Sequence, residues 1–137
     1  MGWLILIGML QAPSPQASHE GLADQARSAF LTAEFGRLFD PRRSVRLELT
    51  GGIVGSLVKG PLAATLLTGR ARRHRTVSVV VVRSAVESGR GVVELLRVIQ
   101  AVGTQETRRE RILLGTTYVD QGWRVDEVLF LGQPVGS

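Results

Sequence analysis

The stretch Arg111–Leu131, RILLGTTYVDQGWRVDEVLFL, decides the fold that we predict for this chain. Two segments rich in β-branched, leucine and aromatic residues, 107–119 and 123–131, flank the tripeptide Asp120-Gln121-Gly122. Because a glycine adopts a positive φ at little cost, this tripeptide is typical of a tight turn between two strands. The stretch therefore predicts a β-hairpin near the end of the chain.

Three earlier segments also have the character of strands. Segments 76–83 (TVSVVVVR) and 91–102 (GVVELLRVIQAV) are dense in apolar, mostly β-branched residues and are joined across a short turn at 87–90. Segment 45–49 alternates apolar and charged residues, as a half-buried strand does. We expect about five strands, and short turns between successive strands make an antiparallel sheet.

Two helices are predicted before most of these strands. Apolar residues recur at three- and four-residue spacing from Glu20 to Phe39, and Asp40-Pro41 then ends the helical pattern. Gly60-Pro61 predicts the start of a second helix that ends at about Arg70 or Arg73. The predicted fold is therefore α+β, with N-terminal helices packed on one face of a curved antiparallel sheet of about five strands.

Length and composition narrow the class of protein. A chain of 137 residues with 44% hydrophobic and 21% charged residues is typical of one globular domain. The absence of cysteine excludes disulfides, thiolate nucleophiles and zinc-thiolate sites. The net charge is +5, and Lys59 is the only lysine among 17 basic residues. We interpret this arginine bias first as codon usage and second as a phosphate-binding signal.

The N-terminal segment has the character of an export signal. Trp3–Leu10 is apolar and, at about 1.5 Å per residue in a helix, too short to cross a bilayer core of roughly 30 Å. A Pro/Ser/Gln-rich stretch follows it, although no Lys or Arg precedes it. We predict a signal peptide and linker over 1–19, one domain over 20–133, and an exported, periplasmic or cell-envelope location. The alternatives are a short apolar element packed on the domain and a cytoplasmic protein.

The order of these elements resembles the nuclear transport factor 2-like superfamily of cone-shaped domains. The segments that carry the resemblance are Ala26–Leu49 and Arg111–Leu131. In the superfamily a Gly-Trp-Arg-Val type motif begins the last strand, and Gly122-Trp123-Arg124-Val125 stands in that place. The chain is most similar to small exported bacterial members of unassigned function. The resemblance implies a shape and no particular reaction.

Candidate site residues follow from the resemblance and from the strands. Enzymes of the superfamily that resemble isomerases or cyclases hold a carboxylate inside the cone, so Glu94 and Asp126, with Tyr118 as a hydroxyl partner, are the candidate pocket residues. The alternative places these carboxylates on a solvated outer face, paired with arginines. The resemblance also implies that Trp123 packs beneath the first helix, in a core with Phe30 and Leu38.

Other kinds of site have weak support. His19 and His74 are far apart and no cysteine accompanies them, so we predict no metal, and no cofactor motif is present. The basic runs Arg70–Arg75 and Arg108–Arg111 have no aromatic residues between them, which excludes a base-stacking platform for specific nucleic-acid binding.

Three functions remain open. The first is an exported, non-enzymatic module that binds a small apolar ligand in the concave sheet, or a second copy of itself through the sheet. The second is a small isomerase- or cyclase-like enzyme with a carboxylate in the cone. The third is a cytoplasmic module whose arginines bind anions.

Overall fold

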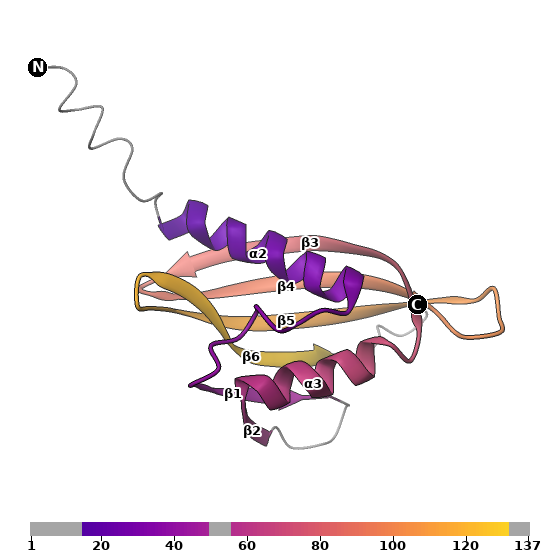
Figure 1. The fold of residues 1–137 in the computed structure, drawn as a ribbon. Coiled ribbons are helices and arrows are strands. Elements are labelled where there is room, and N and C mark those ends of the chain that lie inside the picture. The colour runs from indigo at the N-terminus through magenta and orange to yellow at the C-terminus, as the bar shows by residue number, and fades with distance from the viewer. Residues whose placement is uncertain (1–14, 50–55, 132–137) are drawn as a thin grey trace, which may run out of the picture.

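The computed structural model describes residues 15–49 and 56–131. The predicted signal segment Trp3–Leu10, the glycine-rich turn 51–55 and the predicted domain end at 133 lie outside the described residues. The elements are listed in chain order: α2 (Pro15–Thr32), β1 (Ser44–Glu48), β2 (Ser56–Lys59), α3 (Gly60–Ala71), β3 (Arg75–Glu87), β4 (Arg90–Gln100), β5 (Thr107–Val119) and β6 (Gly122–Leu131) (Figure 1). Neither helix is long and apolar enough to span a membrane.

The fold is α+β, as predicted, but the sheet has six strands instead of five and is mixed instead of antiparallel. The strand order is β2-β1-β6-β5-β4-β3. All neighbours pair antiparallel except β1 and β6, which run parallel because β1 adds to the sheet beside the last strand of the chain. The strand missed by the sequence analysis is β2, whose four residues are largely exposed and follow a glycine-rich segment.

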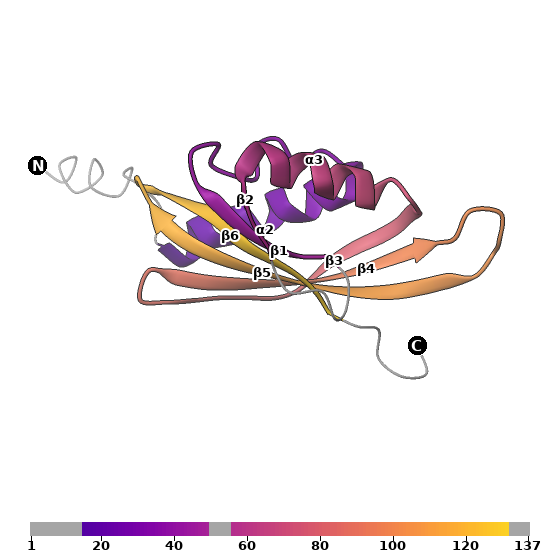
Figure 2. The same cartoon turned by 90° about the horizontal axis from the view of Figure 1, so that it is seen from below.

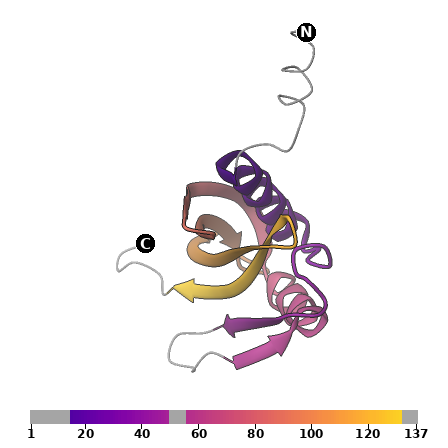
Figure 3. The same ribbon diagram turned by 90° about the vertical axis from the view of Figure 1, so that its left-hand side faces the viewer.

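Both helices lie on the same side of the sheet (Figure 2). We call this side the inner face and the opposite side the outer face. Viewed from its end, the sheet bends around the side that carries the helices (Figure 3). Along β4 the residues alternate between buried and half-buried, as expected of a strand with one face beneath helices and the other less covered.

The core lies between the inner face and the helices. Phe30, Leu38 and Trp123 are all buried, with exposed fractions of 1%, 2% and 4%. The Phe30 ring makes edge-to-face contacts with Phe35 and with Phe130, whose ring centroids lie 4.8 Å and 6.2 Å away. These contacts join α2, the turn after it and β6 into one aromatic cluster.

The bounds of α2 differ from the predicted helix at both ends. The helix begins at Pro15, so the predicted domain start at Glu20 falls inside it. It ends at Thr32 because Ala33 adopts a left-handed conformation with φ of 59°, and the Glu34 N–H then donates to the Ala29 carbonyl at 3.1 Å. The sequence gives little sign of this end, since alanine replaces the usual glycine.

The start of α3 agrees with the Gly-Pro prediction. Gly60 is the first residue of the helix and Pro61 occupies its first turn. A Cβ on Gly60 would lie 2.5 Å from the Asp40 carbonyl oxygen, so only glycine lets the two segments approach this closely. This contact holds the start of α3 against the turn that precedes β1.

Candidate functional site

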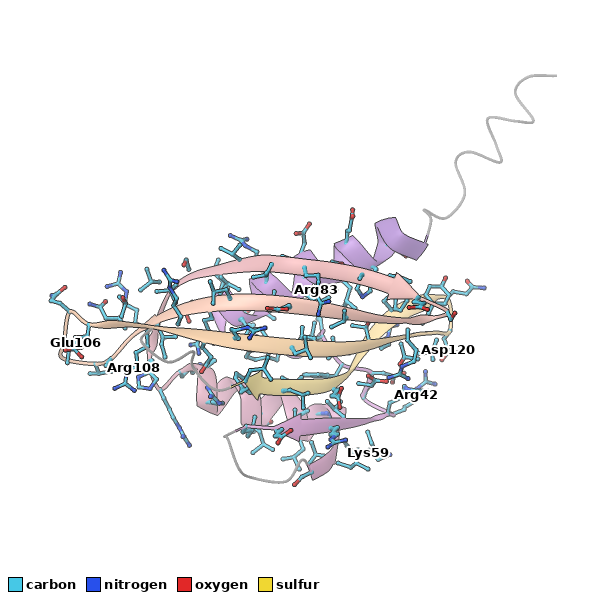
Figure 4. The ribbon with its side chains drawn as sticks, turned by 180° about the vertical axis from the view of Figure 1, so that it is seen from behind. Arg42, Lys59, Arg83, Glu106, Arg108 and Asp120 are labelled. Carbon is cyan, nitrogen blue, oxygen red and sulfur yellow. The ribbon has the colours of Figure 1, made fainter. Side chains whose placement is uncertain are left out.

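The outer face of the sheet carries apolar side chains that no element of the described chain covers. Val80 and Val82 on β3 are 53% and 54% exposed. Alternation along the neighbouring strands adds half-buried leucines and a valine to the same face: Leu96, Val98, Leu113, Leu129 and Leu131. The view in Figure 4, from the side opposite Figure 1, places the sheet in front of the helices, with Arg83 near its middle. Apolar side chains and arginines therefore share this surface.

Glu94, a candidate pocket residue, lies on this outer face and away from the helices. Its Oε2 accepts hydrogen bonds from Nε and Nη2 of Arg111 at 3.2 Å and 2.9 Å. Its Oε1 lies 3.7 Å from Nη2 of Arg83. The alternative considered for this residue, a carboxylate paired with arginines outside the cone, describes this environment.

Asp126 lies at an irregularity between β5 and β6. The pairing register shifts between Gly115 and Thr116, which leaves Asp126 without a partner residue on β5. The Thr117 hydroxyl donates to Oδ2, and Nη2 of Arg90 lies 3.6 Å from the same oxygen. Oδ1 is buried, and no described residue forms a hydrogen bond with it.

Tyr118, the third candidate pocket residue, is separate from both carboxylates. It pairs with Trp123 across the β5–β6 turn, and the two rings meet edge to face with centroids 5.3 Å apart. Tyr118 is 41% exposed at the end of the sheet. The structure therefore does not bring Glu94, Asp126 and Tyr118 together into one pocket.

A buried polar cluster that the sequence analysis missed lies on the inner face around His19. The ring is fully buried in α2, with Nδ1 2.8 Å from the Ser84 hydroxyl and Nε2 2.8 Å from the Thr116 hydroxyl. It also packs edge to face on Trp123, with centroids 4.7 Å apart. Burial lowers the pKa of His19, and the charge of Glu20 opposes this effect.

The sequence signal for this cluster is Gly91, a glycine inside a strand that is rich in valine and leucine. A Cβ on Gly91 would lie 2.5 Å from Nε2 of His19 and 2.6 Å from the Thr116 hydroxyl. Glycine inside a strand marks such close approaches. The cluster attaches the beginning of α2 to the sheet, so His19 is part of the folded domain.

A second buried polar cluster joins α3 to the sheet. Arg97 is 1% exposed, and its guanidinium donates to the Thr76 hydroxyl, to the Ala71 carbonyl and, at 3.1 Å, to Oε1 of Glu110. Nη1 of Arg70 donates to Oε2 of Glu110 at 2.8 Å. Glu110 is thus an inner-face carboxylate with both oxygens bonded to arginines.

Two members of this second cluster, Arg97 and Glu110, could have been found by pairing strands. Arg97 and Glu110 are opposite each other in the β4–β5 register, where opposite charges stabilise a sheet. Arg97 also donates to the last residue of α3, where a cation interacts favourably with the helix dipole. Arg97 and Glu110 therefore attach the end of α3 to the sheet and stabilise the fold.

Other described residues do not form a metal site. No group of three His, Asp or Glu side chains converges within residues 15–49 and 56–131. His74 lies in the turn between α3 and β3, far from His19 in the sequence.

Comparison with known proteins gives the fold a name. No protein-family model matches the chain, and no curated protein matches it. Among solved structures, a protein titled "Rd1NTF2_04 with long sheet" is 16% identical with a TM-score of 0.64, covering 83% of this chain and all of its own. An NTF-2 like protein of unknown function from Silicibacter pomeroyi is 12% identical with a TM-score of 0.55, covering 84% of this chain and 92% of its own.

The chain has the nuclear transport factor 2-like fold. A bacterial protein of the DUF4783 family, from Bacteroides uniformis, shares this fold with a TM-score of 0.64 and 10% identity, over 81% of this chain and 96% of its own. Likenesses at such low identity show the fold alone. The function of this nuclear transport factor 2-like domain must therefore be argued from its own surfaces.

Proposed function

We propose that this nuclear transport factor 2-like domain is a non-enzymatic interaction module that pairs with a second copy of itself through the outer face of its sheet. The observation that carries the proposal is the apolar surface of β3–β6, where Val80 and Val82 are more than half exposed. Exposed apolar side chains that gather on one face are typical of an interaction site, and here they alternate with the charged residues Arg83, Glu94 and Arg111.

The size of this face suits a homodimer. Four strands at about 4.8 Å spacing and ten residues at about 3.3 Å each span roughly 600 Å² in projection, and side chains add to that area. Stable interfaces bury about 800 Å² on each partner. The outer face of β3–β6 is thus near the area that a specific dimer requires.

The charges on this face also favour a second copy as the partner. Arg83 and Arg111 surround the half-buried Glu94, so that both signs lie close together. In a two-fold dimer the same patch meets itself, and a patch of mixed charge places opposite charges across the interface more readily than a patch of one sign.

The polar residues of the inner face give less support to the alternative function, a small enzyme with a carboxylate in the cone. The carboxylate of this face, Glu110, is bonded to Arg97 and Arg70, and both ring nitrogens of His19 are bonded to hydroxyl groups. A general acid or base needs a free path to substrate. These hydrogen bonds favour a structural role for Glu110 and His19, and the outer face is the better candidate for binding a partner.

Light scattering after size exclusion tests this proposal. The wild-type chain at tens of micromolar, roughly the range in which a specific dimer persists, should have twice the mass of one chain. Val80→Arg places repelling charges in the interface and should give a monomer. Leu62→Arg is the matched control, because Leu62 is 48% exposed on α3, on the helix side, and should leave the dimer intact. A wild-type monomer would contradict the proposal.

We also propose that the protein is exported, on the apolar segment Trp3–Leu10 and the Pro/Ser/Gln-rich stretch after it. His19 restricts where cleavage can occur, because a mature chain that lacked this residue would lose the cluster that attaches α2. Sequencing the N-terminus of the native protein tests export, and retention of Met1 in a cytosolic fraction would contradict it.

A further inference from the structure

The end of the molecule that carries the β4–β5 hairpin is strongly basic. Five exposed arginines lie there, and among the described residues none of them has an ion-pair partner: Arg72, Arg73, Arg75, Arg108 and Arg109. We call these five residues the arginine end. The single exposed acid in the hairpin loop is Glu106, so positive charge dominates. Figure 4 labels Glu106 and Arg108 at this end of the sheet, with Arg42 and Lys59 at the other.

The fold brings these arginines together from two segments that are far apart in the sequence, 72–75 and 108–109. Arg72 and Arg73 follow α3 directly, and Arg75 begins β3. Arg75 pairs with Gln100 on β4, which in turn pairs with Thr107, the residue before Arg108 on β5. Two inter-strand spacings of about 4.8 Å therefore separate Arg75 from the arginines of β5.

An apolar side chain projects from the same end. Val102 lies in the loop between β4 and β5 and is 82% exposed, the largest exposed fraction of any large hydrophobic residue in the part of the chain that the structure describes. The loop extends beyond the rest of the sheet (Figures 1 and 2). A cavity of about 550 Å³ beside it is lined by Arg75 and the loop residues Ala101–Gln105.

We infer that the arginine end and Val102 form a surface that binds anionic phospholipid bilayers. Arginines bind phosphate groups, and each basic residue near an anionic membrane contributes favourably to binding. An exposed valine at the tip of a projecting loop enters the boundary between headgroups and acyl chains once the arginines hold the surface nearby. The arginines thus suit the phosphate headgroups of an anionic bilayer, and Val102 suits the apolar layer beneath them.

The placement of aromatic residues favours a bilayer over a nucleic acid. Non-specific single-strand binding uses aromatic side chains on which bases stack. Among the described aromatic residues only Tyr118 is exposed, and ten residues of β5 at about 3.3 Å each place it roughly 33 Å from Arg108. The arginine end therefore has charge for phosphate and an apolar tip, but no described stacking platform.

Vesicle co-sedimentation with the full chain tests this inference. The probe is a vesicle of phosphatidylcholine with about one third phosphatidylglycerol, compared with phosphatidylcholine alone. Arg108→Gln/Arg109→Gln should weaken binding to the anionic vesicles about 25-fold, from roughly fivefold for each arginine. Arg42→Gln/Arg43→Gln removes the same charge from the opposite end and should weaken binding less than about threefold.

The paired variants also control for the apolar N-terminal segment. Trp3–Leu10 can attach to lipid by itself, but both double variants retain it, so only their difference measures the arginine end. Circular dichroism of both variants checks that they fold. Equal binding by the two double variants, or equal binding of the wild type to anionic and neutral vesicles, would overturn the inference.

Val102→Ser distinguishes lipid from other polyanions. It should weaken vesicle binding by roughly threefold, because a valine that enters the bilayer boundary buries apolar area. Binding to a fluorescent single-stranded oligonucleotide at the same salt concentration provides the comparison. Tighter binding to the oligonucleotide than to the vesicles, without an effect of Val102→Ser on either, would identify a general polyanion surface and overturn the lipid assignment.

Discussion

Replacing Gly91 by alanine tests whether the beginning of α2 is attached to the sheet by His19. The added Cβ would lie 2.5 Å from the His19 ring, 2.6 Å from the Thr116 hydroxyl and 2.9 Å from the Ala85 carbonyl oxygen. The first two atoms belong to a hydrogen-bonded pair, and the third belongs to the neighbouring strand. The methyl group therefore has no direction in which to move without separating bonded groups.

The expected loss of stability is about 2–3 kcal/mol. Overpacking of a filled core costs roughly 1–3 kcal/mol, and disturbing a hydrogen bond of the buried ring adds about 1 kcal/mol. Alanine recovers about 0.5 kcal/mol in a strand relative to glycine. Urea titration measures the free energy directly, and the melting temperature should fall by about 6–15 °C.

Two further variants make this result specific. Gly69 lies exposed in α3 with nothing within 4 Å of its would-be Cβ, so Gly69→Ala should stabilise the protein by about 0.5–1 kcal/mol. In a His19→Ala background, Gly91→Ala should cost about 1 kcal/mol less than in the wild type, because the ring is gone and only the contacts with the Thr116 hydroxyl and the Ala85 carbonyl remain. If Gly91→Ala left the melting temperature unchanged in the wild type, His19 would not lie against Gly91, and the account of α2 would be refuted.

The other predictions concern the buried clusters and the N-terminus. Arg97→Met leaves the buried Glu110 with one cation and should cost about 3–5 kcal/mol in urea titration; unchanged stability would contradict the network. Trp123→Ala should cost about 3–5 kcal/mol in thermal unfolding, and a change of a degree or two would mean that the indole is not in the core. Burial holds the folded-state pKa of His19 below 6.5, so its neutral form stabilises the fold fully above about pH 6.5. That contribution is lost as pH falls through the folded value, and His19→Asn should flatten the decline in stability. In an exported protein we expect sequencing to place the mature N-terminus at or before Pro15, and a mature chain beginning after His19 would contradict the proposed role of that residue.

Much of the fold could be predicted from local patterns. The hairpin of β5 and β6 lies where it was predicted, but the turn residues with positive φ are Asp120 (50°) and Gln121 (62°), and not Gly122, which begins β6. The start of α3 follows from Gly-Pro, because proline suits the first turn of a helix. The end of α2 at Thr32 could not be predicted, because Ala33 adopts a left-handed conformation that alanine rarely takes. The strand β2 has only four residues, too few to show the alternation of apolar and polar residues that predicts a strand.

The candidate site could be predicted less well than the fold. Strand alternation gives two faces but does not say which one meets the helices, so Glu94 was as compatible with the inner face as with the outer one. The buried role of His19 depends on a contact with Thr116, 97 residues away in the chain. Such contacts are fixed by tertiary packing and leave only indirect signs in the sequence, such as Gly91.

The rate at which a single cysteine on the outer face reacts with a maleimide tests the proposed dimer most directly. The chain has no cysteine, so Val80→Cys and Leu62→Cys each contain one reactive thiol, on the outer face and on the helix side respectively. Rates are compared at roughly 100 μM and roughly 0.1 μM protein, which bracket a micromolar dissociation constant. We expect the thiol at position 80 to react at least about tenfold more slowly at the high concentration, because the dimer covers it, and the thiol at position 62 to react equally fast at both. Equal rates for position 80 at the two concentrations would contradict the proposal that the outer face pairs with a second copy.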